Sequence, residues 1–229
     1  MPAYNEEESI SRVVEEWAEA IRRAGEGSRF VILNDGSKDG TLNVLNKLKE
    51  KFSFLEVIDK PNSGHGPTCL MGYKHAVEQG ADYVFQTDSD GQTSIKDFWP
   101  FWEERDNYDL IIGFRAVRGD GAARWFISRF LRCVIWVIFG VFVKDANTPF
   151  RLMKTEKLKK NLALVPEKFF LANVLLATLF VKNGEKVRWR QIAFAPRTGG
   201  VPSISFKKFF RVGLKVIDDL WRFKHRAKV

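Results

Sequence analysis

The sequence of 229 residues contains only two cysteines, Cys69 and Cys133. Two cysteines are too few for a disulfide framework, and neither has the spaced partners of a zinc site. The longest uncharged apolar run, residues 133–143, has 11 residues, whereas a membrane-spanning helix needs about 18. The N-terminus also lacks the basic and then apolar pattern of a signal peptide. These absences predict no transmembrane segment and favour a reducing, cytoplasmic location.

Acidic residues are scarce relative to basic ones, but only at one end of the chain. The net charge is +9, and residues 206–229 hold eight Lys or Arg against two Asp, a net of +6. The first 205 residues carry a net of only +3. The basic excess is therefore a local C-terminal feature, and we expect no nucleic acid among the partners.

The composition is that of an ordinary folded protein, with 45% hydrophobic and 28% charged residues. It excludes disordered and collagen-like chains, and the length fits one large domain with an appendage. We expect a domain over residues 1–205 and a C-terminal helix over residues 206–229.

Short apolar runs that end in polar turns predict buried strands, and amphipathic segments between them predict helices. The predicted strands cover residues 30–33, 54–58, 83–85 and 110–112. The predicted helices begin near Asn5, Thr41, Pro67 and Ser94, with Asn5, Thr41 and Ser94 as N-caps. Strands that alternate with helices predict an α/β fold with a mostly parallel sheet and helices on both faces.

The polar turns at Asp35 and at residues 88–90 both follow predicted strands. We expect them to converge on one crevice, because ligand loops lie at the carboxyl ends of parallel strands. A parallel α/β domain also normally enters its first helix from a strand, but only Met1 precedes Pro2. We therefore expect the first strand of the sheet to be missing from this chain.

Asp88 and Asp90 stand one residue apart directly after a predicted strand. Two carboxylates so placed can hold a hard divalent cation against a diphosphate, and the cation then neutralises a leaving nucleotide. A solvated acidic turn is the alternative, because Asp and Gly are also the residues that tight turns require.

Four short segments occur in order along the chain: residues 2–6 (PAYNE), 34–41 (NDGSKDGT), 88–90 (DSD) and 197–200 (RTGG). Together they resemble the motifs of family 2 glycosyltransferases, near the branch of the dolichol-phosphate-mannose synthases. The resemblance covers residues 2–205. It implies a Rossmann-like GT-A domain that binds a nucleotide-diphosphate sugar and a divalent metal, Mg²⁺ or Mn²⁺.

The resemblance also implies where the sugar donor binds. It gives Asp35 the task of accepting a hydrogen bond from the nucleobase, and Asn34 departs from the commoner Asp without changing that expectation. The other residues implied on the donor side are Pro2, Ala3, Tyr4, Glu6, Gly64, Pro67, Asp88 and Arg197. In this scheme Arg197 clamps the diphosphate, and we expect His65 to be a surface residue.

Gln92 resembles a family position that assists at the metal site, so the expected metal residues are Asp88, Asp90 and Gln92. A capping or surface role for Gln92 is the alternative. On the acceptor side, the segment 145–151 resembles one in which Arg151 holds a phosphate and Asp145 orients it. An ordinary internal ion pair explains these two residues about as well.

Glu167 is the nearest candidate for a catalytic base, although Lys168 stands where the family often has Asp. A phosphate acceptor is already ionised and needs no strong base. The sequence therefore leaves open both a hydroxyl and a polyprenyl-phosphate acceptor. A place in the first turn of a helix explains Glu167 equally well.

The C-terminal segment has the pattern of a basic amphipathic helix. At 100° per residue, the apolar residues of 206–223 fall in an arc of roughly 200°, and the charged residues fall on the other side. Large aromatics beside basic residues suit the surface of an anionic bilayer, and Trp136 and Phe139 are candidates for a second contact. A helix packed on the core with a solvated basic face is the alternative.

These observations predict an inverting, metal-dependent glycosyltransferase in cell-envelope glycan synthesis. We expect a polyprenyl-phosphate, lipid-linked or polysaccharide acceptor, and peripheral contact with the inner face of the cytoplasmic membrane. Two alternatives stay open. A sugar nucleotidyltransferase also uses a parallel sheet and a metal, but its Gly-rich, basic N-terminal signature is absent. A membrane-associated sugar-nucleotide-binding protein would keep the fold without turnover.

Overall fold

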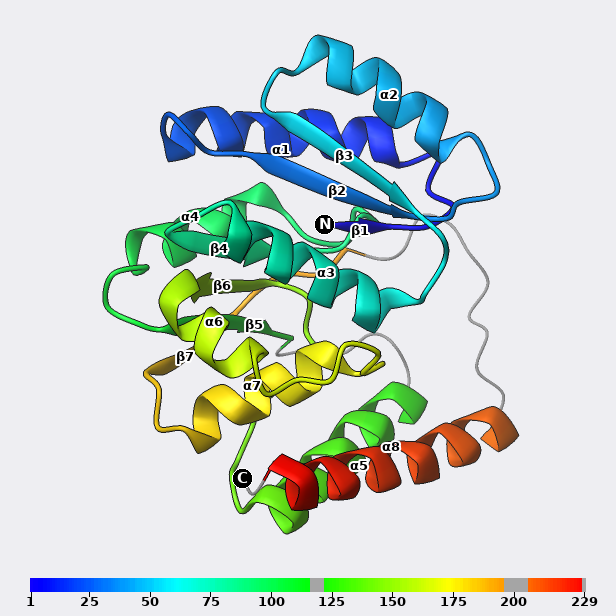
Figure 1. The fold of residues 1–229 in the computed structure, drawn as a ribbon, viewed down its shortest axis with the longest axis vertical. Coiled ribbons are helices and arrows are strands. Elements are labelled where there is room, and N and C mark those ends of the chain that lie inside the picture. The colour runs from blue at the N-terminus through cyan, green and yellow to red at the C-terminus, as the bar shows by residue number, and fades with distance from the viewer. Residues whose placement is uncertain (116–121, 196–205, 228–229) are drawn as a thin grey trace.

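The computed structural model describes the backbone of residues 1–115, 122–195 and 206–227, and the side chains of these residues except 122–127, 206–213 and 227. The described residues form seven strands and eight helices. The strands make two sheets, and the helices lie around them (Figure 1). The strands are β1 Pro2–Ala3, β2 Phe30–Asp35, β3 Leu55–Lys60, β4 Tyr83–Gln86, β5 Leu110–Phe114, β6 Arg151–Lys154 and β7 Val187–Gln191. The helices are α1 Ile10–Ala24, α2 Thr41–Lys51, α3 His65–Glu78, α4 Ile95–Glu103, α5 Ala122–Phe139, α6 Thr155–Leu162, α7 Ala172–Lys182 and α8 Phe206–Ala227.

The first sheet has the order β1-β2-β3 and is entirely parallel, with Pro2 opposite Leu33 and Phe30 opposite Leu55. The second has the order β4-β6-β5-β7, in which β6 runs antiparallel to both of its neighbours and β5 pairs parallel with β7. The predicted α/β class is confirmed, as are the strands at β2, β3, β4 and β5. The antiparallel strand β6 was not predicted.

The prediction that a helix begins at Asn5 is wrong, because α1 begins at Ile10 after Ser9. Asn5 has a positive φ of 54°, which a helix does not allow. Residues 5–7 instead hydrogen-bond to the loop at residues 37–41. The predicted cap Ser94 is confirmed, since its hydroxyl accepts a hydrogen bond from the Lys96 amide at 3.2 Å.

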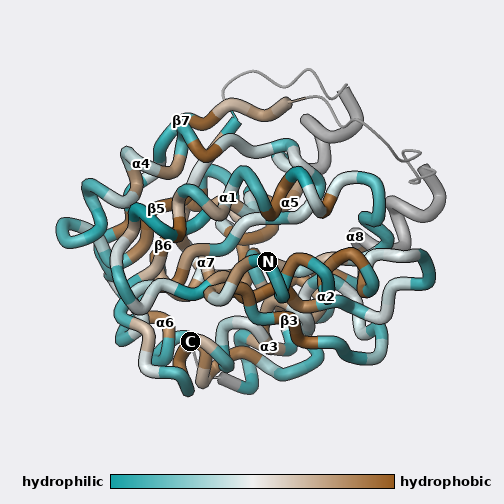
Figure 2. The backbone as a smooth tube through the Cα atoms, turned by 90° about the horizontal axis from the view of Figure 1, so that it is seen from above, coloured by the Kyte–Doolittle hydropathy of each residue, from teal (hydrophilic) through white to brown (hydrophobic). Residues whose placement is uncertain are grey.

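The expected first strand is not wholly missing, because Pro2 and Ala3 form β1 in its place beside β2. Two residues cover only part of the six-residue strand β2. A cavity of about 660 Å³ therefore lies between the two sheets, with β2 on one side, β4 on the other, and α1 and α3 above and below. Met1 lies at this cavity in the interior of the molecule, where its amino group donates to the Val31 carbonyl (Figures 1 and 2).

The hydrophobic core has two parts. One surrounds α1 and includes Trp17, whose ring lies 5.3 Å from that of Phe85. The other surrounds α7, in which every residue from Ala172 to Phe180 is buried. A helix that is apolar on all sides belongs in a core. This core fixes the first turn of α7 beside α3, which matters for the site below.

Helices α5 and α8 lie side by side at one end of the molecule (Figure 1). Val216, Leu220 and Phe223 of α8 are buried in the same core as α7, so this helix packs on the domain. Leu214 and Trp221 of the same helix are 55% exposed. Among the helices that the structure describes, none has both the length and the apolar character that crossing a bilayer requires.

Candidate active site

The segment that follows β1 is hydrogen-bonded to the turn that follows β2. The backbone amides of residues 5, 6 and 7 donate to side chains of the turn, and two amides of the turn donate back. These bonds are Asn5 N to Ser37 Oγ, Glu6 N to Thr41 Oγ1, Glu7 N to Asp39 Oδ2, Lys38 N to Asn5 Oδ1 and Gly40 N to Glu7 Oε2, all between 2.8 and 3.2 Å. Tyr4, next to this segment, is 43% exposed.

Asp35 ends β2 with a carboxylate that is almost fully buried, its side chain being 5% exposed. The carboxylate forms an ion pair with Lys60 and accepts hydrogen bonds from the amides of Ser63 and Gly64, both at 2.9 Å. Burial alone would raise the pKa of Asp35, but the hydrogen bonds from Lys60 and Ser63 outweigh it and lower that pKa. In this arrangement Asp35 holds the loop after β3.

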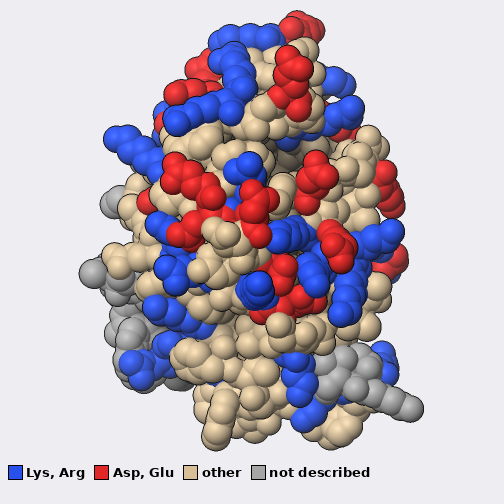
Figure 3. Space-filling view, turned by 90° about the vertical axis from the view of Figure 1, so that its left-hand side faces the viewer, with Lys and Arg blue, Asp and Glu red and all other residues tan. Residues whose placement is uncertain are grey.

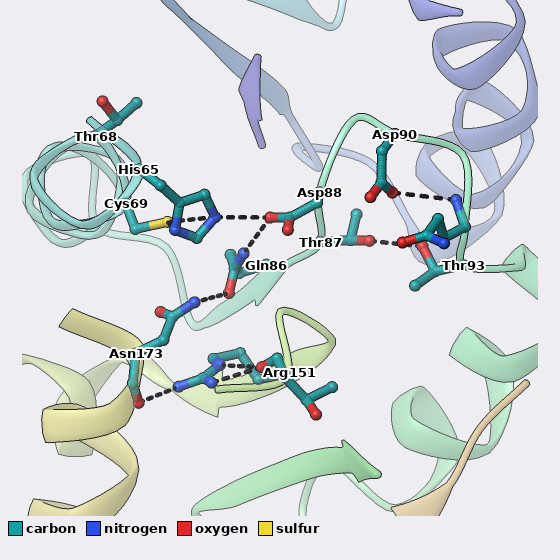
Figure 4. A network of polar contacts seen from close by, with 12 residues as sticks. His65, Thr68, Cys69, Gln86, Thr87, Asp88, Asp90, Thr93, Arg151 and Asn173 are labelled. Atoms are coloured by element: carbon teal, nitrogen blue, oxygen red, sulfur yellow. Dashed lines mark hydrogen bonds and ion pairs between the residues drawn. The ribbon is translucent and has the colours of Figure 1, made fainter. Parts of the chain in front are cut away.

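That loop links the two polar turns. Asn62 Nδ2 donates to the Asp35 carbonyl at 2.8 Å, and three residues later His65 Nε2 lies 3.0 Å from Asp88 Oδ1 (Figure 4). Gly36 permits the close approach, because its φ is +65° and a Cβ there would lie 2.7 Å from the Asn62 nitrogen. The predicted convergence of the turns after β2 and β4 is thus confirmed.

His65 was expected on the surface, yet it contacts a predicted metal ligand. Its side chain is half exposed, at the first residue of α3, and its pKa is raised well above the usual range because its hydrogen bond to Asp88 outweighs burial. Cys69 lies one turn further along α3, with its sulfur 3.7 Å from His65 Nε2. No signal in the sequence identified this contact, because it joins residues 23 positions apart.

The loop after β4 carries the two predicted metal ligands on one short turn (Figure 4). The hydroxyls of Thr87 and Thr93 are hydrogen-bonded at 2.8 Å and close the turn at its base. Asp90 Oδ1 accepts a hydrogen bond from the backbone N–H of Gln92 at 3.1 Å. Gln92 Nε2 donates to the Ala195 carbonyl at 3.0 Å, so this side chain ties the turn to the segment after β7. Within the described part of the chain, no three His, Cys, Asp or Glu side chains cluster as a metal site.

Beneath Asp88 lies a buried polar network. Gln86, the last residue of β4, donates to Asp88 Oδ1 at 3.2 Å and accepts from Asn173 Nδ2 at 3.1 Å. Tyr73 of α3 donates to Asn173 Oδ1 at 2.7 Å (Figure 4 labels the Gln86, Asp88 and Asn173 members). All three neutral residues are at most 3% exposed. None of the three stands in a sequence pattern that predicts a site residue.

Arg151 is fully buried, and its guanidinium donates to backbone carbonyls of Ala146, Thr148 and Asn173 at 2.6 to 3.2 Å. Burial lowers the pKa of Arg151, and the nearby Asp145 carboxylate acts against that shift. Asp145 itself is half-buried in the loop before β6. The guanidinium thus holds this loop against α7 and has four of its five N–H groups engaged by carbonyls.

Glu167 lies elsewhere. Its side chain is 80% exposed and pairs with Lys74 at 2.6 Å, and Lys74 lowers the pKa of the Glu167 carboxyl. Lys74 is nine residues beyond His65 on α3, which corresponds to about 13 Å along the helix. Pro67 and Glu167 line a shallow cavity on the outer face of α3. Gly64 caps α3 at φ 88°, and Arg197 lies outside the described residues.

Comparison with known proteins gives consistent findings. The family model of glycosyl transferase family 2 matches residues 1–172. A dolichyl-phosphate beta-glucosyltransferase (ALG5D) of Trichomonas vaginalis is 32% identical over 177 residues, which are 69% of this chain and 53% of that protein. An undecaprenyl-phosphate 4-deoxy-4-formamido-L-arabinose transferase of Pseudomonas aeruginosa is 26% identical over 204 residues, or 87% of this chain and 58% of that protein. The chain thus spans little more than half the length of these relatives.

Solved structures resemble the chain in fold. Glucosyl-3-phosphoglycerate synthase from Mycobacterium tuberculosis, in complex with Mn²⁺ and UDP-glucose, has a TM-score of 0.64 at 17% identity, over 97% of this chain and 76% of that one. TarS 1–349 of S. aureus with UDP has a TM-score of 0.56 at 21% identity, over 96% and 63% of the two chains. These likenesses confirm the predicted GT-A fold.

Proposed function

Because this chain belongs to glycosyl transferase family 2, we propose that it transfers a sugar, with inversion, from a nucleotide-diphosphate sugar to a polyprenyl phosphate. One observation carries the proposal. One loop joins the turn with Asp88 and Asp90 to the hydrogen-bonded segments after β1 and β2: its Ser63 and Gly64 amides bind Asp35, and its His65 lies 3.0 Å from Asp88 Oδ1. This is the arrangement that a donor needs, with the nucleoside at one end and the diphosphate at the other.

In this proposal the turn after β2 lies at the nucleoside end of the sugar donor, and the turn after β4 lies at its diphosphate end. Pro2, Ala3, Tyr4 and Glu6 border the nucleoside end together with the loop that Asp35 holds. Asp35 therefore shapes the nucleobase pocket through the amides of Ser63 and Gly64. We keep Arg197 as the group that clamps the diphosphate, on the resemblance of its sequence segment alone.

The residues present fit a divalent cation that binds together with the donor. Asp88 and Asp90 supply two carboxylates, the ligand type that Mg²⁺ and Mn²⁺ prefer, and no third such side chain is clustered with them among the described residues. Oxygens of the diphosphate and water would complete the coordination. When bound, the cation neutralises the charge of the leaving nucleotide. Gln92 is the third predicted metal residue, and its side-chain amide oxygen would be the atom that binds the cation.

The acceptor side supports a phosphate acceptor. A phosphate monoester is ionised at neutral pH and attacks without a strong base. Glu167 is solvent-exposed and paired with Lys74, which suits a protein that needs no base there. Arg151 and Asp145 belong to the acceptor side by resemblance, and the contacts of Arg151 give it the role of holding the loop that borders this side. The named relatives act on dolichyl and undecaprenyl phosphates.

A lipid acceptor requires access to a bilayer, and α5 with α8 offers a surface for it. Over residues 128–139 of α5, whose side chains the structure describes, the exposed residues form one stripe that is mostly apolar, with Trp136 at 60% and Val137 at 66%. Phe142, beyond the helix, is 66% exposed. The two helices hold ten Lys or Arg and two Asp, which is +8 of the net charge of +9. Figure 3 shows basic and uncharged groups without acidic ones at this end of the visible face. We therefore place the protein on the inner face of the cytoplasmic membrane.

Vesicle binding tests the membrane contact. Wild-type protein should co-sediment with phosphatidylglycerol vesicles at low salt, and the double variant Trp136→Ser/Trp221→Ser should bind at least tenfold less. Both side chains are exposed, so the fold should be retained. Lys47→Gln/Lys49→Gln on α2, at the opposite end of the molecule, tests whether basic residues away from α5 and α8 contribute, and it should bind as the wild type does (Figure 1). Equal binding by all three proteins would contradict the proposed surface.

Transfer itself is tested with labelled nucleotide sugars, Mn²⁺ and a short-chain polyprenyl phosphate. The expected product is a lipid-extractable glycosyl phosphate, formed by the wild type and not by Asp90→Asn. A sugar nucleotidyltransferase would instead release pyrophosphate from a nucleoside triphosphate and a sugar phosphate. A binding protein would be stabilised by the nucleotide sugar without turnover. Either of these results would contradict the proposal.

A further inference from the structure

Only one oxygen of the Asp88 carboxylate, Oδ1, is used in its hydrogen bonds to described residues. Among the described residues, its two hydrogen bonds both go to Oδ1, from His65 Nε2 at 3.0 Å and from Gln86 Nε2 at 3.2 Å. The side chain is 27% exposed. With Oδ1 engaged twice, Oδ2 is the oxygen that remains for a ligand in the crevice.

The orientation of Gln86 follows from hydrogen-bond chemistry. An ionised carboxylate only accepts, so Gln86 must turn its NH₂ group toward Asp88 and its carbonyl oxygen away. That carbonyl oxygen meets Asn173 Nδ2 at 3.1 Å, and Asn173 Oδ1 in turn accepts the Tyr73 hydroxyl at 2.7 Å. Tyr73 remains a donor, because burial raises its pKa well above the ordinary value. The Tyr73 hydroxyl also lies 3.1 Å from Gln86 Oε1, so that oxygen faces donors from both Asn173 and Tyr73, while the Gln86 NH₂ group faces Asp88.

The network is anchored in rigid parts of the molecule. Tyr73 lies in α3, Asn173 in the first turn of the fully buried helix α7, and Gln86 at the end of β4. The backbone carbonyl of Asn173 also accepts a hydrogen bond from Arg151 at 2.9 Å. In a buried network a flip of any amide would leave donors facing donors or acceptors facing acceptors, which is costly.

We propose that Gln86 is a positioning residue that turns the Asp88 carboxylate so that only Oδ2 is presented to the divalent cation of the donor complex. This inference rests on the proposed function. Groups that orient metal ligands typically change metal affinity by about 10- to 100-fold when they are removed. Gln86 touches neither donor nor acceptor in this scheme and acts through Asp88 alone.

The experiment measures Mn²⁺ binding in the presence of UDP, by titration calorimetry on the full chain, with thermal unfolding measured in parallel. Gln86→Met keeps the length and the apolar stem of the side chain and removes both hydrogen-bonding groups. We expect the Mn²⁺ dissociation constant to rise roughly tenfold. Tyr73→Phe removes the hydroxyl that contacts Gln86 Oε1 and Asn173 Oδ1 but keeps the hydrogen bond from Gln86 to Asp88. We therefore expect a smaller rise of about two- to threefold, and this variant serves if Gln86→Met does not fold.

Thr178→Val is the matched control. Thr178 is a fully buried residue of the same helix α7, and its hydroxyl donates to the Val174 carbonyl at 2.8 Å without contact to the network. Its loss should leave the Mn²⁺ dissociation constant unchanged. An unchanged constant in folded Gln86→Met or Tyr73→Phe, or an equal rise in Thr178→Val, would overturn the positioning role. Absence of Mn²⁺ binding in the wild type would instead overturn the proposed metal dependence, on which this role rests.

Discussion

Asp35 ends β2 and Asp88 follows β4, and both carboxylates were expected to contact the sugar donor or its metal. The Asp35 side chain is 5% exposed and engaged by Lys60 and by two backbone amides. The Asp88 side chain is 27% exposed, and its two hydrogen bonds to described residues share one oxygen. Asp35 thus has both carboxylate oxygens bound by the fold, whereas Asp88 uses only Oδ1 in its hydrogen bonds to described residues.

The difference shows that an aspartate after a parallel strand can serve either structure or ligand. What decides between these roles is the loop after β3, which brings the amides of Ser63 and Gly64 to Asp35 and the imidazole of His65 to Asp88. Amides of the main chain cannot be removed by a ligand, whereas an exposed imidazole can turn away. Mutation of Asp88 should therefore reduce sugar transfer with little loss of stability, whereas mutation of Asp35 should mainly reduce stability.

The largest effect is expected from Asp88→Asn. The change is nearly isosteric but removes half of the carboxylate charge available to a cation, whose electrostatic contribution to such reactions is several kcal/mol. Sugar transfer should fall by roughly 100-fold or more, while the melting temperature changes little. Transfer assays with circular dichroism check both. Full metal-stimulated activity in the folded variant would contradict the role of Asp88.

Asp35→Asn should show the opposite signature, with a loss of stability as its main effect. The Lys60 ammonium would be left buried without its partner carboxylate, because the Lys60 side chain is only 12% exposed. Loss of one partner of a buried ion pair costs about 3 kcal/mol in the free energy of unfolding. Urea denaturation measures it. The double variant Asp35→Asn/Lys60→Met, which removes both charges, should recover part of the loss, and no recovery would mean that the ion pair is not the cause.

The pH dependence of stability should also separate Asp35 from a solvent-exposed carboxylate. The folded-state pKa of Asp35 lies below its ordinary value of 3.8, so the native state binds fewer protons than the unfolded state. Its contribution to stability is complete well above pH 4 and is lost as the pH falls below 4 through the folded-state pKa. The difference in unfolding free energy between wild type and Asp35→Asn should therefore shrink below pH 4. A constant difference from pH 6 to pH 3 would contradict this assignment.

The smallest effect is expected from Glu167→Gln. Its carboxylate is solvent-exposed and paired with Lys74, and exposed pairs contribute little to stability. We expect no measurable change in melting temperature and nearly wild-type transfer to a polyprenyl phosphate. Lys74→Met, which removes the same ion pair, is the control for any structural effect. A 100-fold loss of transfer confined to Glu167→Gln would identify Glu167 as the base that a hydroxyl acceptor needs.

The sequence was informative wherever a pattern was local. The strands β2 to β5 are short apolar runs, and the convergence of the turns at Asp35 and Asp88 follows from strand direction alone. The start of α1 was predicted wrongly because Asn5 hydrogen-bonds to Lys38, 33 residues away, instead of capping a helix. Local signals cannot reveal such a partner.

The same reason explains what was missed in the site. Gln86 and Asn173 are 87 residues apart, and neither side chain stands in a recognisable pattern. A glutamine at the end of a strand and an asparagine in an apolar helix predict little individually. Only the packing of α7 against α3 and β4 makes them part of one network. The resemblance to a known family located Asp88, but not the groups that orient it.

The cavity between β2 and β4 makes this part of the molecule the one that should respond first to hydrostatic pressure. Pressure favours whichever state occupies less volume, so poorly filled space in the folded state is a point of weakness under compression. About 660 Å³ of such space, partly open to solvent, lies between the two sheets, lined by Leu33 of β2 and Gln86 of β4 among others. Compression should therefore bring β2 and β4 together before the densely packed α7 core responds.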